Sequence, residues 1–387
     1  MRIVHIITRL IVGGAQENTL ITCRLLAERG HEVVLVTGPA LGPEGQLFGH
    51  TVGQPYHTTV VKEMRRQIAP VKDFISYHRI KGLLEGLRPD IVHTHSAKAG
   101  ILGRLAAHNM GRGRPGIVHG VHGLSFHPYQ RPALNRFYIA MERAAARWTD
   151  HFVTVADAMT EQSRAAGIGL DRPYTTAYSA IDEEAFTRAI PERERAAFRR
   201  QYEIPEDAVV LVTVARLFML KGHEFIIESA RTLAPKHDKV VWLFVGNGNL
   251  ADRYKGQIER LGLSDRFRFT GLLEPGQIPL AIQASDVLVH CSLREGLART
   301  LPQAMLCSRP VISFDVDGAR EVVTPDTGRL IRPKDIPQLT EACEELIQDP
   351  SLRARLGRNG LASVKKRFAP ETMVDTIERV YGEVRRL

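Results

Sequence analysis

Apolar residues fall along the chain in short runs, separated by stretches with helical spacing. In the first half the runs occupy residues 2–8, 31–37, 90–94, 116–121 and 151–155. In the second half they occupy residues 209–215, 240–246, 266–271, 286–291 and 310–314. Short apolar runs bounded by turn residues predict buried strands, and the spacing over residues 16–29 predicts a helix. Gly30 stands where the C-terminal glycine of that helix belongs.

A polar, charged interval at residues 181–207 separates the two series of runs. Strands that alternate with helices predict a parallel sheet covered on both faces. A chain of 387 residues is also too long for one ordinary core. We therefore expect an α/β protein of two Rossmann-like domains, residues 1–181 and 182–370, whose sheets face each other across a cleft. A helix over about residues 371–387 is expected to pack back on the first domain.

The composition is that of a globular protein, with 44% hydrophobic and 25% charged residues. No stretch approaches the roughly 20 apolar residues of a spanning helix, and the first residues predict a strand rather than a signal peptide. Cys23, Cys291, Cys307 and Cys343 lack CxxC spacing. We therefore expect no metal or disulfide role for these cysteines, and we expect a cytoplasmic location.

The net charge of +9 is compatible with nucleic acid, anionic lipid or phosphorylated ligands. Because no basic tail or recognisable nucleic-acid module accompanies it, no nucleic-acid partner is expected. Basic residues on or near predicted helices of the first half suit a peripheral contact with the anionic inner face of a membrane. Ordinary solvated helix faces are the alternative. These residues are Arg65, Arg66, Lys72, Lys81, Arg131, Arg136, Arg143 and Arg147.

Gly13 and Gly14 lie between the first strand and its helix. Glycines at this position let the backbone approach a ligand, and the amides at a helix start attract an anion. A structural turn is the alternative. The sequence GGAQEN lacks the third glycine of the dinucleotide fingerprint GxGxxG, so a hydride-transfer enzyme is not favoured.

Two cations follow the strand predicted at residues 209–215. Arg216 comes directly after it, and Lys221 lies five positions on, at a helix start. Two such groups at the carboxyl end of a buried strand can converge on one anion. Away from such a strand end, the simpler interpretation would be two solvated charges on a loop.

A carboxylate follows the strand predicted at residues 286–291. Glu295 there can accept hydrogen bonds from hydroxyl groups or cap the next helix. That helix, beginning near Ala298, would direct free amides and its positive dipole end at a phosphate.

With these residues the chain resembles family 4 of the retaining glycosyltransferases, which have the two-domain GT-B fold. In the first half the resemblance is carried by GGAQ at 13–16, PDIVHTHSAKAGILGRLAA at 89–107, VHGLSFH at 121–127 and YSAID at 178–182. In the second half it is carried by RL and KG at Arg216 and Lys221, VGNG at 245–248, FTG at 269–271 and EG at Glu295. The middle block particularly resembles enzymes that build bacterial capsule, exopolysaccharide or lipopolysaccharide.

The resemblance implies catalytic roles for four residues. Arg216 and Lys221 match the pair that neutralises the donor diphosphate. Glu295 matches the carboxylate that binds donor-sugar hydroxyls, and His122 matches a histidine close to the reacting centre.

The resemblance also implies a set of donor-binding residues. Gly14, with Gly13, matches a loop that closes over the diphosphate, and amides near residues 298–301 meet sugar and phosphate. The donor-binding residues are thus Gly13, Gly14, Gly246, Ala298, Arg299, Thr300, Leu301 and Gln303. The family pattern has two glutamates separated by seven residues, and here the second is Gln303. A glutamine carbonyl can still accept a ribose hydroxyl, without the charge assistance worth about 1–2 kcal/mol.

No metal or other cofactor is expected, since protein cations and helix starts can offset the charge on the leaving diphosphate. Asp315 and Asp317 have the letters of a metal-binding pair but are expected to serve a turn. His93 and His95 face the same side of a strand, and without a third ligand they are expected to pack or to bond hydroxyls.

The expected activity is retaining hexosyl transfer from a nucleotide-sugar donor, with UDP favoured over GDP, to a glycan or lipid-linked acceptor. With no carboxylate identifiable as a nucleophile, a front-face reaction is preferred. His95 and Lys98 are expected on the acceptor side. The alternatives are a GT-B-fold sugar-nucleotide epimerase and a non-catalytic sugar-nucleotide-binding protein.

Overall fold

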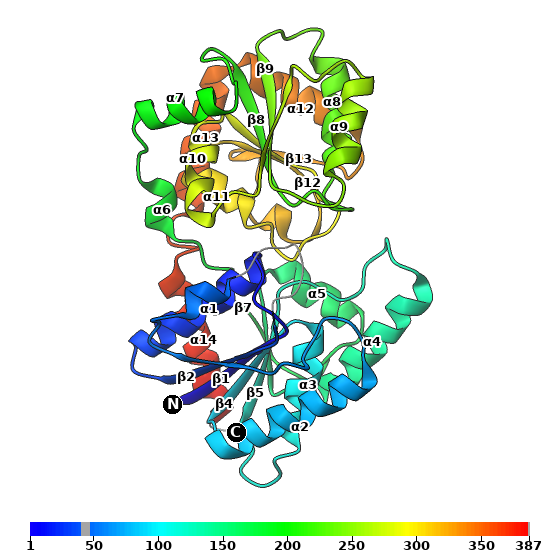
Figure 1. Cartoon of the computed structure of the whole chain (residues 1–387), viewed down its shortest axis with the longest axis vertical. Helices are drawn as coiled ribbons and strands as arrows, with labels where there is room; N and C mark the ends of the chain where they lie inside the picture. The colour runs from blue at the N-terminus through cyan, green and yellow to red at the C-terminus, as the bar shows by residue number, and fades with distance from the viewer. Residues whose placement is uncertain (40–46, 386–387) are drawn as a thin grey trace. The chain divides into compact units, whose positions relative to one another are not determined.

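The computed structural model describes residues 1–39 and 47–385, which form two compact units (Figure 1). The N-terminal unit comprises Met1–Ala180 and Ala369–Leu387, and the C-terminal unit comprises Ile181–Phe368. The chain thus completes one sheet, builds the second, and returns to the first with its last helix.

The sheet of the N-terminal unit has strands in the order β3-β2-β1-β4-β5-β6-β7, and every neighbouring pair is parallel. The strands are Arg2–Ile7 (β1), Glu32–Thr37 (β2), His57–Val60 (β3), Ile91–His95 (β4), Gly116–Val121 (β5), His151–Thr154 (β6) and Tyr174–Thr176 (β7). The strand order reverses between β1 and β4, the switch point at which sheets of this kind bind ligands.

Helices cover both faces of this sheet. They are Gly14–Glu28 (α1), Pro70–Leu87 (α2), Ala97–His108 (α3), Pro132–Ala146 (α4), Asp157–Ala165 (α5) and Pro370–Arg385 (α14). Because side chains of a strand alternate between faces, Ile3 and Ile7 pack with residues of α1 and α14. Val4 and Ile6 pack with residues of α2 and α3 on the other face.

Three histidines occupy sheet positions where the alternation would place apolar residues. His5 lies between Ile3 and Ile7 on β1, while His93 and His95 follow Ile91 at alternate positions of β4. Each is at most 3% exposed. They therefore form a polar patch within the otherwise apolar face that α14 covers.

The sheet of the C-terminal unit has strands in the order β10-β9-β8-β11-β12-β13, again with every pair parallel. The strands are Val209–Val214 (β8), Val240–Val245 (β9), Phe267–Gly271 (β10), Val287–His290 (β11), Val311–Phe314 (β12) and Gly328–Ile331 (β13). The helices are Glu183–Thr187 (α6), Glu192–Gln201 (α7), His223–Leu233 (α8), Ala251–Arg260 (α9), Ile278–Gln283 (α10), Thr300–Leu306 (α11), Ile336–Gln348 (α12) and Pro350–Val364 (α13).

The predicted fold class, two parallel Rossmann-like sheets, is confirmed. All ten strands expected from apolar runs are present, with ends that differ by at most one residue. The sequence did not predict β3, β7 and β13, because HTTV, YTT and GRLI are short and partly polar. Each lies at a sheet edge, where a strand has one neighbour and needs fewer apolar residues.

Candidate active site

The loops that follow β8 and β11 are bonded to each other at the carboxyl edge of the C-terminal sheet. The carbonyl of Leu220 accepts from the amide of Leu293 at 2.8 Å and from Ser292 Oγ at 3.0 Å. Gly222 has φ 77°, and a Cβ there would lie 1.8 Å from the carbonyl oxygen of Cys291. Only glycine fits this approach, so the loop that carries Lys221 is held against the end of β11.

This loop contact brings Lys221 and Glu295 together. Lys221 Nζ donates to Glu295 Oε1 at 2.6 Å, and His290 Nε2 lies 3.3 Å from the same oxygen. The side chains of Lys221 and Glu295 are 23% and 18% exposed, so both can still meet a ligand. The amide of Glu295 donates to Asp317 Oδ2 at 2.6 Å, which fixes the backbone beneath the carboxylate.

Glu295 is held ionised by its neighbours. Burial alone would raise the pKa of its carboxyl, but the Lys221 cation and the nearby His290 imidazole outweigh burial and hold that pKa well below its ordinary value of 4.5. The carboxylate is therefore an acceptor at every physiological pH, which suits the binding of hydroxyl groups.

Arg216 and Gly246 lie in the adjoining loops at the same sheet edge. Arg216 is exposed, with its guanidinium carbon 5.2 Å from the centre of the Phe218 ring. Gly246 has φ 138°, and a Cβ there would lie 2.2 Å from the carbonyl oxygen of Ala215. The glycine thus lets the loop after β9 pack directly against the backbone that carries Arg216.

The predicted donor-binding segment forms the start of α11. The helix begins at Thr300, and the carbonyls of Ala298 and Arg299 accept its first backbone bonds. The side chains of Ala298 and Leu301 are buried, so these two residues could contact a ligand only through backbone groups. Thr300 Oγ1 lies 3.5 Å from His290 Nδ1, and Gln303 is partly exposed one turn further on.

Two residues of this site were not identified as functional from the sequence. His290 contacts both Glu295 and Thr300. The sequence feature that could have identified it is a polar residue at the end of the otherwise apolar strand VLVH. Asp317 was expected only to serve a turn, and its carboxylate also accepts from the amide of Glu295. Asp315 pairs with Arg320.

In the N-terminal unit, the glycine turn and His122 follow neighbouring parts of the sheet's carboxyl edge. The carbonyl of Gly13 accepts from the amides of Gln16 and Glu17, so Gly13 caps α1 and the exposed Gly14 is its first residue. His122 comes directly after β5 and is partly exposed. Its Nε2 atom lies 2.9 Å from His95 Nδ1.

The two residues expected on the acceptor side are both engaged within the unit. Lys98 Nζ donates to Asp73 Oδ1 at 2.6 Å and to the carbonyl of Gln67, and its side chain is 12% exposed. An acceptor phosphate would have to compete with Asp73 for this ammonium. His95 is buried between His5 and His122 and is 3% exposed.

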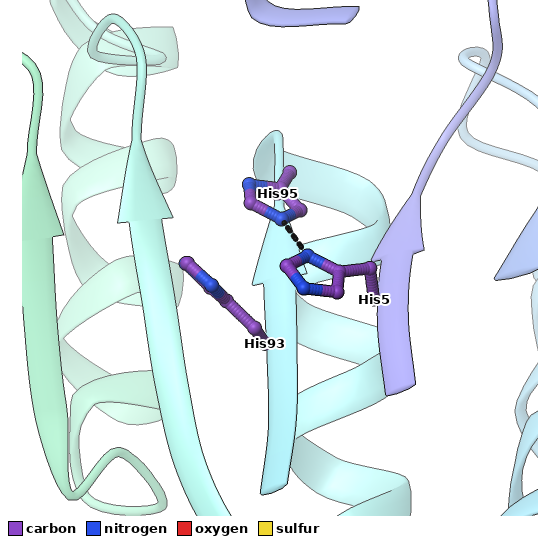
Figure 2. Close-up of side chains that lie close together, drawn as sticks. All are labelled: His5, His93 and His95. Atoms are coloured by element: carbon purple, nitrogen blue, oxygen red, sulfur yellow. Dashed lines mark hydrogen bonds between the residues drawn. The ribbon is translucent and has the colours of Figure 1, made fainter. Parts of the chain in front are cut away.

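His93 and His95 have the third histidine that the sequence did not show, namely His5 of β1 (Figure 2). One nitrogen from each lies within 4.8 Å of the others, a grouping that could hold a metal ion. His5 Nδ1 and His95 Nε2, however, are 2.9 Å apart, the distance of a hydrogen bond. Two ligands of tetrahedral zinc would lie about 3.3 Å apart.

Both units therefore present polar and charged side chains at the carboxyl edges of parallel sheets. Among the described residues, no helix combines the length and apolar character that crossing a membrane requires. This architecture, two parallel Rossmann-like sheets in one chain, is that of the GT-B fold.

Comparison with known proteins identifies the family. The model for Glycosyltransferase Family 4 matches residues 12–185, and the model for Glycosyl transferases group 1 matches residues 194–362. Together they account for most of the chain, which belongs to the family 4 glycosyltransferases. The predicted family membership is confirmed.

Individual relatives agree with this assignment. EpsD of Bacillus subtilis (strain 168), described as a glycosyltransferase, is 28% identical over 82% of this chain and 83% of its own. The UDP-Gal:α-D-GlcNAc-diphosphoundecaprenol α-1,3-galactosyltransferase of Escherichia coli is 26% identical over 98% of this chain and 96% of its own. The crystal structure of Anabaena HepE with UDP and glucose is similar in fold, with a TM-score of 0.84, 20% identity and 99% of each chain covered.

We predict that Lys221→Met raises the pKa of Glu295 relative to the wild type, because burial then acts with less opposition. In the wild type the folded pKa is depressed, so ionised Glu295 stabilises the fold above pH 4.5, and this stability is lost as the pH falls through the folded pKa. In Lys221→Met the free energy of unfolding should therefore depend less on the ionisation of Glu295 and fall less as the pH is lowered. A ¹³C NMR titration of the glutamate carboxyls, assigned with Glu295→Gln, measures the change.

Lys221→Arg is the matched control, since it keeps a cation beside the carboxylate. Identical titrations of Glu295 in the wild type, Lys221→Arg and Lys221→Met would show that the ion pair does not set this pKa.

Proposed function

We propose that this chain is a retaining hexosyltransferase that moves a sugar from a nucleoside diphosphate donor to a hydroxyl of a glycan or lipid-linked glycan. The observation that carries the proposal is the direct pairing of Lys221 with an ionised Glu295 at the carboxyl end of a parallel sheet. A cation and a carboxylate side by side fit the two parts of such a donor, its anionic diphosphate and its sugar hydroxyls.

In this proposal the fixed charges of the protein stabilise the leaving group. Arg216 and Lys221 neutralise the diphosphate, and the backbone at the start of α11 and at Gly14 donates to its oxygens. Preorganised donors of this kind stabilise developing charge without reorganisation. We therefore propose that transfer needs no metal ion.

The sugar would be held by Glu295 through its hydroxyls, with His122 close to the reacting carbon. We propose a front-face reaction, in which the bond from the anomeric carbon to the diphosphate oxygen breaks while the acceptor oxygen bonds from the same side. The acceptor proton passes to the departing phosphate, so no protein carboxylate forms a bond to the sugar. Because the acceptor attacks from the side that the diphosphate leaves, the anomeric configuration of the sugar is kept.

UDP is the nucleotide that we favour, with GDP as the alternative. Support comes from the similarity to the Escherichia coli enzyme, whose name gives UDP-Gal as its donor and a diphosphoundecaprenol acceptor. Gln303 is proposed to accept a ribose hydroxyl through its carbonyl oxygen. The binding of UDP would then lack the charge assistance that a glutamate supplies.

A lipid-linked acceptor would require this protein to reach a membrane surface, and an exposed patch at the start of α2 suits such a contact. Its apolar side chains are Ile68, Val71, Phe74 and Ile75, which are 64%, 73%, 65% and 37% exposed. Arg65, Arg66 and Lys72 beside them are exposed as well. We name these seven residues the α2 patch. Apolar side chains ringed by cations fit the interface of an anionic bilayer.

The position of the α2 patch supports the same idea. Asp73 caps α2 through the amide of Ala69 and pairs with Lys98, which lies one residue into α3. Since α3 starts directly after β4, the patch is tied to the carboxyl edge of the sheet that bears His122. A lipid-linked acceptor bound there would have its lipid near the bilayer.

UDP is predicted to stabilise the wild type by about 2.7 kcal/mol when present at a hundredfold excess over its Kd. Arg216→Ala should lose most of this stabilisation and about 3 kcal/mol of transition-state stabilisation, roughly a hundredfold in turnover. Thermal shift with UDP, GDP, ADP and their sugars measures binding, and release of free nucleotide measures transfer.

Gln303→Glu is the matched variant, because it restores charge assistance and should tighten UDP binding. Near-normal turnover in Arg216→Ala would remove Arg216 from the proposal, and the absence of a shift with every nucleotide would contradict the donor site as a whole.

The product is predicted to keep the anomeric configuration of the donor sugar. The ¹H NMR coupling constant of the anomeric proton, read in donor and product, checks this directly. Trapping of a covalent glycosyl-enzyme would contradict the front-face reaction, even if the configuration were retained.

The α2 patch is predicted to bind phosphatidylglycerol vesicles at low salt, and neutral phosphatidylcholine vesicles much less. The triple change Val71→Ser, Phe74→Ser, Ile75→Ser should abolish co-flotation, since each buried apolar side chain contributes about 1.5–3 kcal/mol. Leu170→Ser, at a side chain 64% exposed in the same unit, is the control and should bind normally. Equal flotation of the triple variant and Leu170→Ser would show that the α2 patch does not bind the vesicles.

A further inference from the structure

A chain of hydrogen bonds connects the last helix of the protein with His122, entirely within the N-terminal unit. Tyr381 Oη of α14 lies 2.7 Å from His93 Nδ1 and 3.4 Å from His5 Nε2. His5 Nδ1 lies 2.9 Å from His95 Nε2, and His95 Nδ1 lies 2.9 Å from His122 Nε2. We name these five residues the histidine chain. Figure 2 shows its central bond, from His5 on β1 to His95 on β4.

The backbone is arranged to let these rings meet. His5 and His93 are direct partners in the register of β1 and β4, and His95 is the partner of Gly120 on β5. A Cβ at Gly120 would lie 2.8 Å from His95 Nδ1, 3.1 Å from His93 Nε2 and 3.3 Å from His122 Nε2. A glycine at this position therefore leaves the space in which the nitrogens converge.

The buried members of the histidine chain are neutral. Burial lowers the pKa of His5 to about 3 and lowers the pKa values of His93 and His95 well below 6.5. Burial also raises the pKa of Tyr381 well above 10. A neutral imidazole has one N–H donor and one acceptor nitrogen. The direction of one hydrogen bond therefore determines the direction of the next from His5 through His95 to His122.

Two arrangements of protons satisfy this rule for the three rings. In one, His122 Nε2–H donates to His95 and His95 Nε2–H donates to His5, so the proton of His122 is on Nε2. In the other, His5 Nδ1–H donates to His95 and His95 Nδ1–H donates to His122, so the proton of His122 is on Nδ1. The hydroxyl of Tyr381 selects between them, because it accepts from His5 Nε2–H in the first arrangement and donates to His5 Nε2 in the second.

We propose that Tyr381, His5 and His95 are positioning residues that fix the ring orientation and tautomer of His122. The bond between His95 Nδ1 and His122 Nε2 passes this choice on to His122, which then carries its proton on one nitrogen only. The inference rests on the proposed role of His122 close to the reacting centre. It assigns to the α14 hydroxyl the task that the third member of a catalytic triad performs, holding a histidine in one tautomer.

The same nitrogens define the competing interpretation, a buried metal site formed by His5, His93 and His95. A metal would coordinate through lone pairs and would dismantle the bonds to Tyr381 and between His5 and His95. The two interpretations therefore give opposite results in a measurement of the imidazole nitrogens.

The experiment is a two-dimensional ¹H–¹⁵N NMR spectrum of the full-length protein labelled with ¹⁵N-histidine, with His122 assigned by His122→Ala. In the wild type His122 should be a single tautomer. In Tyr381→Phe, which removes one buried oxygen and keeps the ring, His122 should become a mixture of both tautomers. We expect its turnover to fall about tenfold, as for other residues that orient a functional histidine, with KM for the donor unchanged.

Tyr174→Phe is the matched control. It removes a tyrosine hydroxyl of the same unit that donates to the carbonyl of Ile168 at 2.9 Å and lies outside the histidine chain. His122 should keep its tautomer in this variant, and turnover should remain normal.

A second pair of variants covers the case in which Tyr381→Phe does not fold. His95→Asn places an amide, which can donate or accept, close to the position of Nδ1 and should retain a single tautomer of His122 and most of the turnover. His95→Leu removes the hydrogen-bonding group and should lose both. A rescue of this kind would not follow from a role of His95 in packing alone.

The outcomes separate this inference from the proposed function. An unchanged His122 tautomer in Tyr381→Phe and His95→Leu refutes the positioning role, whatever the activity. Stoichiometric zinc in the purified protein, with metal-shifted resonances of His5, His93 and His95, refutes it in favour of the metal site. Normal turnover in His122→Ala, with the tautomer changes as expected, refutes instead the proposed role of His122 in the reaction.

Discussion

The parallel direction of every strand is the constraint on which the rest of this structure depends. Parallel neighbours need a crossover between them, so each strand is followed by a loop that leaves the same edge of the sheet. All functional candidates of each unit are consequently gathered at one edge, although they are far apart in the sequence. Lys221 and Glu295 are 74 residues apart and share a hydrogen bond of 2.6 Å.

Close backbone contact converts this general arrangement into a defined site in the C-terminal unit. Gly222 lets the loop after β8 touch the carbonyl of Cys291, and Gly246 lets the loop after β9 touch the carbonyl of Ala215. The charged side chains then need little freedom to meet, because their backbones are already fixed. Asp317 completes the support through the amide of Glu295, which explains why an acidic pair resembling a metal motif has a structural task.

The N-terminal unit achieves a comparable precision by burying polar groups. Neutral histidines in a sheet lose hydration, and the hydrogen bonds that they make with each other and with Tyr381 offset part of that loss. Tyr381 joins His93 and His5 in this set from α14, the last helix of the chain. The return of the chain to its first unit therefore gives the β1–β4 region a hydrogen-bond partner that the adjacent strands do not offer.

The sequence by itself determined the two parallel sheets, since ten apolar runs and the intervening helical spacing reflect burial that each segment needs locally. It also indicated Arg216, Lys221 and Glu295, because a charge directly after a buried strand has a known place at the sheet edge. It could not pair His5 with His93, or identify His290 as the neighbour of Glu295. Strand order and register decide those contacts, and a face of a sheet combines residues from strands that are distant in sequence. The edge strands β3, β7 and β13 were missed for a related reason, as their pairing is specified by a neighbouring strand more than by their own residues.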